Sequence, residues 1–409
     1  MSGPSFDFTV PPAAAPLVAG VREFLEREIR PIEAELAFVM EDERRHLTEE
    51  GRLIPEVVAA KDRIRVLAAK AGYYAAQMPT ELGGLGLGPL DLMYLQEEVY
   101  RDGLKLMKEV LAWTEGPNLA LLCLDEEQRR RYLLPMIRGE VTAAVAITEP
   151  VAGSDATAIE TTATRDGDDW VLNGHKVFIT NAPFANFAFV IAKTQPAAGK
   201  RGMTAFIVDR DTPGYQVGRM NTTLIEDGNT AELHFESCRV PAANVVGSVG
   251  QGLYFFLAWI NNRRLGRGGM CAGLGRFCFE RALAYARRRT AFGHRIGDWQ
   301  AVQWMLVDSY VDIYAARALS ASCLAEITSE DLSTFKPRPE VIRKIAMVKV
   351  FNDETLYRVA DRAIQVHGAL GLTKSLHLEK IFRVARNLRI PAGTTEMQRI
   401  NIAKTLGLG

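Results

Sequence analysis

The sequence predicts an α+β protein that is mostly helical and has three successive regions. Residues 1–140 and 249–409 carry apolar residues at three- and four-residue spacing, which is typical of amphipathic helices. Residues 141–248 instead alternate apolar and polar residues in short runs, separated by glycine, proline and charged turns. We therefore expect a helical domain, then a β domain, then a second helical domain.

Bulk composition fits an ordinary soluble protein. Of 409 residues, 48% are hydrophobic and 24% are charged, and Lys plus Arg equals Asp plus Glu at 49 each, which argues against a general nucleic-acid binder. No apolar run approaches the roughly 18 residues of a membrane span. Five scattered cysteines without CxxC spacing predict neither a disulfide framework nor a metal site. With no basic and apolar leader at its start, the chain is expected to be cytoplasmic.

The first region is predicted to be helical from about Pro16 to Gly139. The stretch "LVAGVREFLEREIRPIEAEL" places Val18, Val21 and Phe24 on one face, together with two further apolar residues. The stretches "EVVAAKDRIRVLAAKAGYYA" and "PLDLMYLQEEVYRDG" continue the pattern.

The middle region opens on "AVAITEPVAGSDA" (144–156), a strand end that runs into a Gly/Ser/Asp loop. Its backbone N–H groups and the hydroxyls of Thr148 and Ser154 suit a flavin edge or a phosphate. The following "ETTATRDGDDWVLNGHKVFIT" reads as a β-hairpin that turns at residues 166–168. Further strands are expected in "FAFVIAKT", "MTAFIVDR" and "AELHFESCRV".

The last region is predicted to hold long helices over about 252–289, 299–328 and 338–368, with a final helix after Gly393.

Five motifs in this order resemble the acyl-CoA dehydrogenase family, over about residues 16–405. The most specific is "TEPVAGSD" (148–155), and "NGHKVFITNA" (173–182) matches a second motif in which Phe178 stands where many members carry Trp. The others are "YARRRTAFGHRIGDWQ" (285–300), "QVHGALG" (365–371), where Ala369 replaces a glycine, and "AGTTEMQRINIAK" (392–404).

This resemblance implies an N-terminal helical domain, a central β-barrel-like domain and a C-terminal four-helix bundle, with FAD between the last two. The residues it places at FAD are Ile147, Thr148, Ser154, Phe178, Thr180, Arg289, Phe292, Gln300, Gln365, Gly368, Thr394 and Glu396. Those it places at an acyl-CoA substrate are Ser154, Asn261, Arg263 and Arg264.

The resemblance also implies partners. Because the Arg289 segment would reach a neighbouring subunit's FAD, we expect a homotetramer, or a heterotetramer with a related subunit. An electron-transfer flavoprotein is the expected electron acceptor. In the family's reaction a carboxylate removes the α-proton of the thioester while a hydride leaves the β-carbon for the flavin.

That carboxylate is missing from both places where the family carries it. The two positions correspond to Ala392 and Arg263. Alanine has no proton acceptor, and an arginine stays protonated and would instead stabilise an anion. The segment "LKLMKEVLAWTEGPNL" (104–119) matches a pocket-lining helix of the family and holds Glu109 and Glu115; of these, Glu115 is the candidate for a relocated base.

Three hypotheses stay open at this point. The protein could be an FAD-dependent dehydrogenase with a relocated or partner-supplied base. It could carry out base-independent chemistry on the same scaffold, such as removing sulfinate from a short sulfinyl acyl-CoA. It could also be a catalytically silent FAD-binding subunit of a hetero-oligomer.

Overall fold

The computed structural model describes residues 8–40 and 42–408. Short helices of the N-terminal region surround an apolar cluster that contains Val21, Phe24 and Ile29. Proline opens two of these helices, where its fixed φ suits the first turn and its missing N–H costs nothing. The α-helices are α1 (Ala15–Phe24), α2 (Arg30–Glu35), α3 (Ala37–Met40), α4 (Pro55–Lys70), α5 (Pro89–Val99), α6 (Glu126–Gln128) and α7 (Leu134–Ile137).

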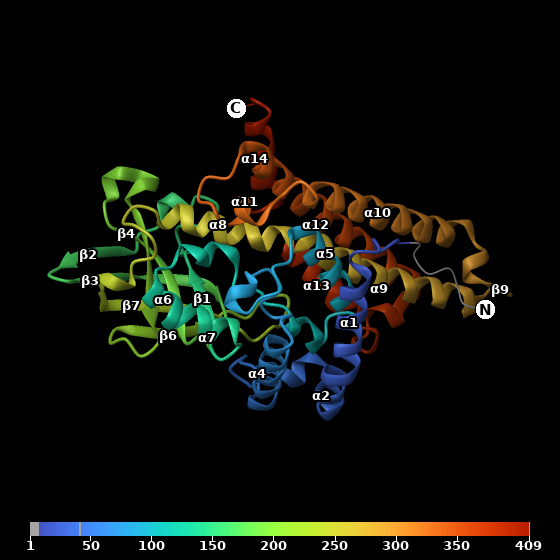
Figure 1. Cartoon of the computed structure of the whole chain (residues 1–409). Helices are drawn as coiled ribbons and strands as arrows, with labels where there is room; N and C mark the ends of the chain where they lie inside the picture. The colour runs from blue at the N-terminus through green and yellow to red at the C-terminus, as the bar shows by residue number, and fades with distance from the viewer. Residues whose placement is uncertain (1–7, 41, 409) are drawn as a thin grey trace.

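The middle region is a seven-stranded sheet at one end of the molecule (Figure 1). The strands lie in the order β1-β4-β2-β3-β7-β6, and β5 pairs with β4. The predicted hairpin is confirmed as β2 and β3, which turn at Gly167 with φ of 61°. The strands are β1 (Ala143–Ala146), β2 (Thr162–Asp166), β3 (Asp169–Thr180), β4 (Phe187–Lys193), β5 (Met203–Asp209), β6 (Tyr215–Met220) and β7 (Thr230–Pro241).

A buried ion pair fixes the loop 148–155 against β3. Lys176 Nζ donates to Glu149 Oε1 at 2.7 Å and to the Ile147 carbonyl at 3.2 Å. Glu149 also accepts from the backbone N–H of Glu160 at 2.5 Å. Burial lowers the pKa of Lys176 to about 8, although the negative charge of Glu149 raises it in part. The pair therefore ties the Gly/Ser/Asp loop to the strand that ends in "NGHKVFIT".

Replacing Lys176 with methionine is expected to lower the free energy of unfolding by about 3–5 kcal/mol, because Glu149 would stay buried without its counter-charge. Guanidinium denaturation measures this loss. The double variant Lys176→Met/Glu149→Gln removes both charges and should recover at least half of the stability. Equal instability of the single and double variants would show that lost packing, not the unpaired charge, is the cause.

The C-terminal region is built on three long helices. The helix expected over about 252–289 is divided at Gly266, where a Cβ atom would lie 3.1 Å from Gln96 Nε2 and 3.3 Å from the Trp113 ring. The helices are α8 (Gly252–Leu265), α9 (Arg267–Arg288), α10 (Gln300–Leu324), α11 (Ser329–Ser333), α12 (Pro339–His367), α13 (Leu378–Leu388) and α14 (Thr395–Thr405), and a short hairpin of β8 (Thr290–Ala291) and β9 (His294–Arg295) joins α9 to α10.

Two glycines let α9 approach α5 closely. A Cβ atom on Gly269 would lie 2.4 Å from the Met93 carbonyl oxygen, and one on Gly273 would lie 2.5 Å from that of Glu97. Since real side chains cannot come so near, any larger residue would push the helices apart. This contact joins the N-terminal region to the bundle. No described helix is long and apolar enough to cross a membrane.

Candidate active site

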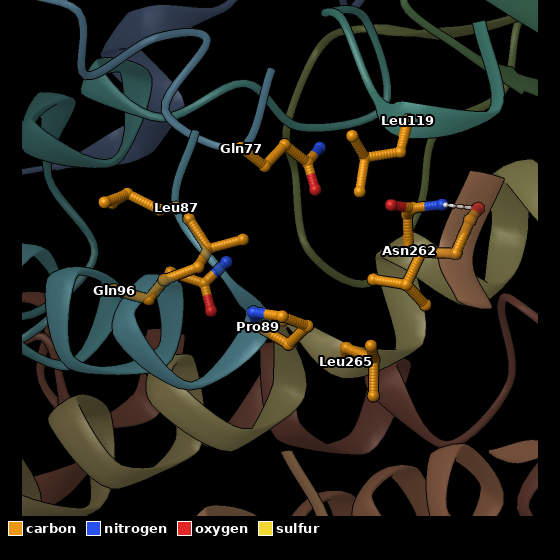
Figure 2. A pocket seen from close by; sticks show the side chains of 10 residues that line it. Gln77, Leu87, Pro89, Gln96, Leu119, Asn262 and Leu265 are labelled. Atoms are coloured by element: carbon orange, nitrogen blue, oxygen red, sulfur yellow. Dashed lines mark hydrogen bonds between the residues drawn. The ribbon is translucent and has the colours of Figure 1, made fainter. Parts of the chain in front are cut away.

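Two adjoining hollows lie where α5, α8 and the segment after Leu111 meet. Both are narrow, because the space that a water-sized sphere can enter is about 10 Å³ in the first and about 20 Å³ in the second. Figure 2 shows Gln77, Gln96 and Asn262 facing the first hollow among apolar side chains. The second hollow shares these three residues and adds Tyr74, Trp113 and Arg263. The lining is thus a mixture of aliphatic side chains, carboxamides and one guanidinium.

The segment 104–119 is not the helix that the resemblance implied. Only Leu106–Val110 forms a helical turn, of the 3-10 type, and the chain then runs irregularly to Asn118. The reason is local, because Gly116 and Pro117 both disfavour a helix. As a result, backbone carbonyls of the segment face α8 instead of being used within a helix.

Arg263 uses these carbonyls as partners. Its Nη1 donates to the Ala112 oxygen at 3.0 Å and its Nη2 to the Gly116 oxygen at 3.3 Å. The guanidinium lies 5.0 Å from the Trp259 ring centroid and 5.9 Å from that of Trp113. Burial lowers the pKa of Arg263 to about 10, which leaves it protonated at neutral pH. Arg263 is therefore a fixed, buried cation, at the position that the resemblance predicts for one of the family's two base residues.

Ala392, which the resemblance predicts for the second base position, is bound by the neighbouring residue Arg264. Arg264 Nε donates to the Ala392 carbonyl at 2.8 Å, and its Nη1 donates to Asn261 Oδ1 at 2.8 Å. Ala392 has φ of 64°, a left-handed conformation that is uncommon outside glycine. The structure thus joins Asn261, Arg264 and Ala392 by hydrogen bonds, with Arg263 next to Arg264 in α8, and their role at a substrate stays a prediction. Ser154, also predicted there, lies on the exposed loop of the β region.

The two glutamates of segment 104–119 have different surroundings. Glu109 lies 3.4 Å from Lys61 Nζ and 3.5 Å from Lys108 Nζ, which together outweigh burial and lower its pKa. Glu115 is half-buried and accepts a hydrogen bond from Thr114 Oγ1 at 3.3 Å. The negative charge of Glu115 raises the pKa of Arg263, but burial lowers this pKa by more. Glu115 is thus the carboxylate of this segment that has no lysine partner among the described residues.

Further buried cations surround this region. Asp353 binds Lys349 at 2.8 Å and lies 3.5 Å from Arg267 Nε. No ion pair is made by Arg263 or Arg264 within the residues that the structure describes. The interior next to the pocket therefore carries more positive than negative charge.

The predicted flavin residues form three separate groups. The first lies at the sheet, where Val177 N–H donates to the Thr148 carbonyl at 2.9 Å and so brings Thr148 beside Phe178. Phe178 is 63% exposed with φ of 57°, at a bulge of β3. Thr180 is the last residue of the strand. Ile147 is buried, and its carbonyl accepts a hydrogen bond from Lys176 Nζ.

The second group lies at the far end of the bundle, where Figure 1 shows β9. Phe292 is 93% exposed, and Arg289 and Gln300 are exposed beside it. His367 stacks on Tyr285 at 4.6 Å between ring centroids, which places the exposed Gln365 and Gly368 near this end. The third group is Thr394, which caps α14 by accepting from Met397 N–H at 3.2 Å, and the exposed Glu396. One chain alone does not gather all twelve residues.

Comparisons with known proteins match the whole arrangement. Residues 13–140, 144–238 and 250–407 match, in turn, the N-terminal, middle and C-terminal domains of acyl-CoA dehydrogenase. The chain belongs to the acyl-CoA dehydrogenase family. FAD is the cofactor of this family, whose members are oxidoreductases.

Relatives and solved structures cover nearly the full length. A 3-(aryl)acrylate reductase of Clostridium sporogenes is 30% identical over 94% of this chain and 96% of its own. A probable acyl-CoA dehydrogenase of Mycobacterium tuberculosis is 31% identical over 98% of each. The crystal structure of an acyl-CoA dehydrogenase from Geobacillus kaustophilus superposes with a TM-score of 0.80 at 28% identity, covering 98% of this chain and 99% of that one.

The surface beside β3 fits this family's cofactor. Phe178 exposes 63% of its area there, and the hydroxyl residues Thr148 and Thr180 lie beside it. A flat, partly apolar ring system with polar edges would cover this apolar area and bond to these groups. When bound, FAD supplies the hydride acceptor or donor of the family's chemistry. The role of each individual residue at FAD stays a prediction.

Several pocket residues escaped the sequence interpretation. Tyr74, Gln77, Gln96 and Asn262 all line the hollows, yet no motif contains them. Asn262 lies between Asn261 and Arg263, so its position in α8 was a signal that could have been used. The other three come from segments whose contact with α8 depends on tertiary packing, which local periodicity does not encode.

Proposed function

We propose that this protein oxidises or reduces the bond between the α- and β-carbons of an acyl thioester, with Glu115 handling the α-proton. The position of Glu115 carries the proposal. It lies on the irregular segment that Arg263 holds, and its charge acts on Arg263 and on the pocket residue Tyr74. Arg263 then has a supporting role, because a fixed cation beside the site stabilises negative charge that develops at the α-carbon and carbonyl.

Either direction of reaction uses the same residues. Glu115 as carboxylate would accept the α-proton in dehydrogenation, and as carboxylic acid would return it in reduction. The relatives include proteins named as reductases as well as a probable dehydrogenase. An electron-transfer flavoprotein is the proposed electron partner, and the cytoplasm the proposed location.

The test is anaerobic mixing of the FAD-loaded protein with saturated acyl-CoAs of varied chain length. We expect the flavin absorbance at about 450 nm to be lost, because a flavin that accepts a hydride becomes reduced and loses this colour. Absence of bleaching at every chain length, together with no oxidation of the reduced protein by enoyl-CoAs, would contradict the proposal.

Desulfination remains the second candidate, because the excess of buried positive charge favours an anionic acyl group. Sulfite released from a sulfinyl acyl-CoA without net flavin reduction would favour it. A silent subunit is the third candidate, and it predicts activity only after mixing with a related chain.

We also propose that the chain assembles as a tetramer. Trp304, Val307, Val311 and Tyr314 form an exposed apolar stripe along one face of α10, with exposures between 52% and 62%. Their spacing of three and four residues places them on one side of the helix, and such a stripe marks an interaction surface. The separated flavin groups described above also suit a cofactor shared between chains.

Replacing Val311 with aspartate is expected to reduce the assembly to dimers or monomers, because a charge would be buried within the stripe. Light scattering after size exclusion should give about four times the chain mass of 45.2 kDa for the unmodified protein. Val249→Asp, which changes an exposed valine outside α10, should leave the mass unaltered. An unchanged mass for the Val311 variant would contradict the use of this stripe.

A further inference from the structure

Three side chains that can bind a metal ion converge on the sheet, on strands β3 and β7. His175 and His234 are direct cross-strand partners in the register of these strands. Glu232 lies two residues before His234 and therefore points to the same face of the sheet. One ligand atom of each residue lies within 4.8 Å of the other two. No sequence motif indicates this group, because His175 and Glu232 are 57 residues apart.

The distances between these ligand atoms suit a small tetrahedral ion. Glu232 Oε2 lies 3.2 Å from His175 Nε2 and 3.5 Å from His234 Nε2. The ligand atoms of a tetrahedral zinc ion lie about 2.0–2.2 Å from it and so roughly 3.3–3.6 Å from one another. The two imidazole rings are stacked, with 14° between their planes, so both must tilt for their nitrogens to reach one ion. Their side chains are 38% and 34% exposed, which leaves room for this tilt and for a water molecule as a further ligand.

Two residues at a bulge of β6 orient this group and keep it open. Arg219 Nη2 donates to Glu232 Oε1 at 3.1 Å, so it holds one carboxylate oxygen and leaves Oε2 toward the histidines. Ligating carboxylates in metal sites are typically hydrogen-bonded in this way. The guanidinium is 81% exposed, so water and salt screen its repulsion of a cation. A Cβ atom on Gly218 would lie 2.6 Å from His234 Nε2, so any larger residue there would displace the ligand atom.

The ligand atoms indicate which class of ion this group binds. Imidazole nitrogen suits zinc, copper and nickel, whereas magnesium and calcium prefer oxygen ligands. We propose that His175, Glu232 and His234 form a binding site for one divalent transition-metal ion of the zinc type, with a water molecule as the fourth ligand. The site does not depend on the proposed function. A bound ion would join β3 to β7, on the strand that also carries Phe178.

Calorimetric titration of the FAD-loaded protein with zinc chloride tests this site without turnover. The protein carries no affinity tag, and a chelator is used to remove metal ions and is then dialysed away. We expect one zinc ion per chain, bound at least about a hundredfold more tightly than magnesium chloride, because imidazole is a poor ligand for magnesium. Zinc should also raise the midpoint of thermal unfolding, since an ion that binds only the folded state stabilises it.

Two variants locate the ion. His234→Asn removes a ligand and should weaken zinc binding at least about a hundredfold, the upper end of the loss that follows removal of a group that only orients a ligand. Gly218→Ala keeps all three ligands but places a methyl group against His234 Nε2, and should weaken zinc binding at least about tenfold. His294→Asn is the matched control, because it removes an exposed histidine of β9 and should leave zinc binding unchanged.

Three results would overturn the proposal. Zinc binding that is unchanged in His234→Asn would place the ion elsewhere on the protein. Equal affinity for zinc and magnesium would show that the imidazoles take no part in binding. A loss of zinc affinity in His294→Asn as large as that in His234→Asn would show non-specific binding to surface histidines.

Discussion

Glu115→Gln is expected to slow flavin reduction by the preferred acyl-CoA about 10²- to 10⁴-fold, the usual contribution of a positioned proton acceptor. Glutamine keeps the size and the hydrogen bond from Thr114 but cannot take a proton. Stopped-flow absorbance under anaerobic conditions measures the rate, and binding of a thioether analogue separates chemistry from affinity.

Glu109→Gln is the matched control on the same segment. Because Glu109 lies between Lys61 and Lys108, its loss should alter stability more than chemistry, and the rate should stay within about threefold. An equal loss in both variants would indicate general disruption of the segment. A normal rate for Glu115→Gln would exclude Glu115 as the base.

Ala392→Glu in the Glu115→Gln background is expected to restore at least about tenfold of the lost rate, since a carboxylate would return to a family base position. The carbonyl of Ala392 is held by Arg264. Its backbone already has the left-handed φ, so a longer side chain adds no new backbone strain. The control Ala392→Gln has the same size and should restore nothing. Equal recovery with glutamine would show that the gain is not proton transfer.

The other base position is a poorer place for this experiment. A glutamate at position 263 would face the Ala112 and Gly116 carbonyl oxygens that the guanidinium now binds. The carboxylate and the two carbonyls are all hydrogen-bond acceptors and cannot bind one another, so the segment would lose its attachment to α8. Arg263 is thus a structural clamp as well as a cation, which its place in the sequence did not reveal.

The sequence predicted the architecture well because the information was local. Apolar spacing of three and four residues in the helices, alternation in β2 and β3, and motifs in a fixed order each depend on neighbouring residues. The division of one long helix at Gly266, which lies close to Gln96 and Trp113 from distant segments, was not predicted.

The candidate site was predicted only in part for the same reason. Ala392 was predicted from its place in the C-terminal motif, and Arg263 from its distance before the residues "AFG" at 291–293. The irregular course of residues 111–117 was missed although Gly116-Pro117 signalled it. The hydroxyl of Tyr74 lies against Gly116 of this segment, where a Cβ atom would be 2.6 Å from Tyr74 Oη. Such features depend on contacts between residues far apart in the chain, which composition and spacing do not specify.

Because the predicted flavin residues lie far apart in one chain, binding of FAD would depend on the concentration of subunits. Strand β3, which carries Phe178, and strand β9, which directly follows Phe292 and Gly293, lie at opposite ends of the molecule (Figure 1). In an assembly where one chain's Phe292 end meets another chain's sheet, every bound FAD stabilises the assembly and every dissociation weakens its hold on FAD. Dilution would then empty the protein of cofactor cooperatively, and added FAD would hold the subunits together at concentrations where the apoprotein falls apart.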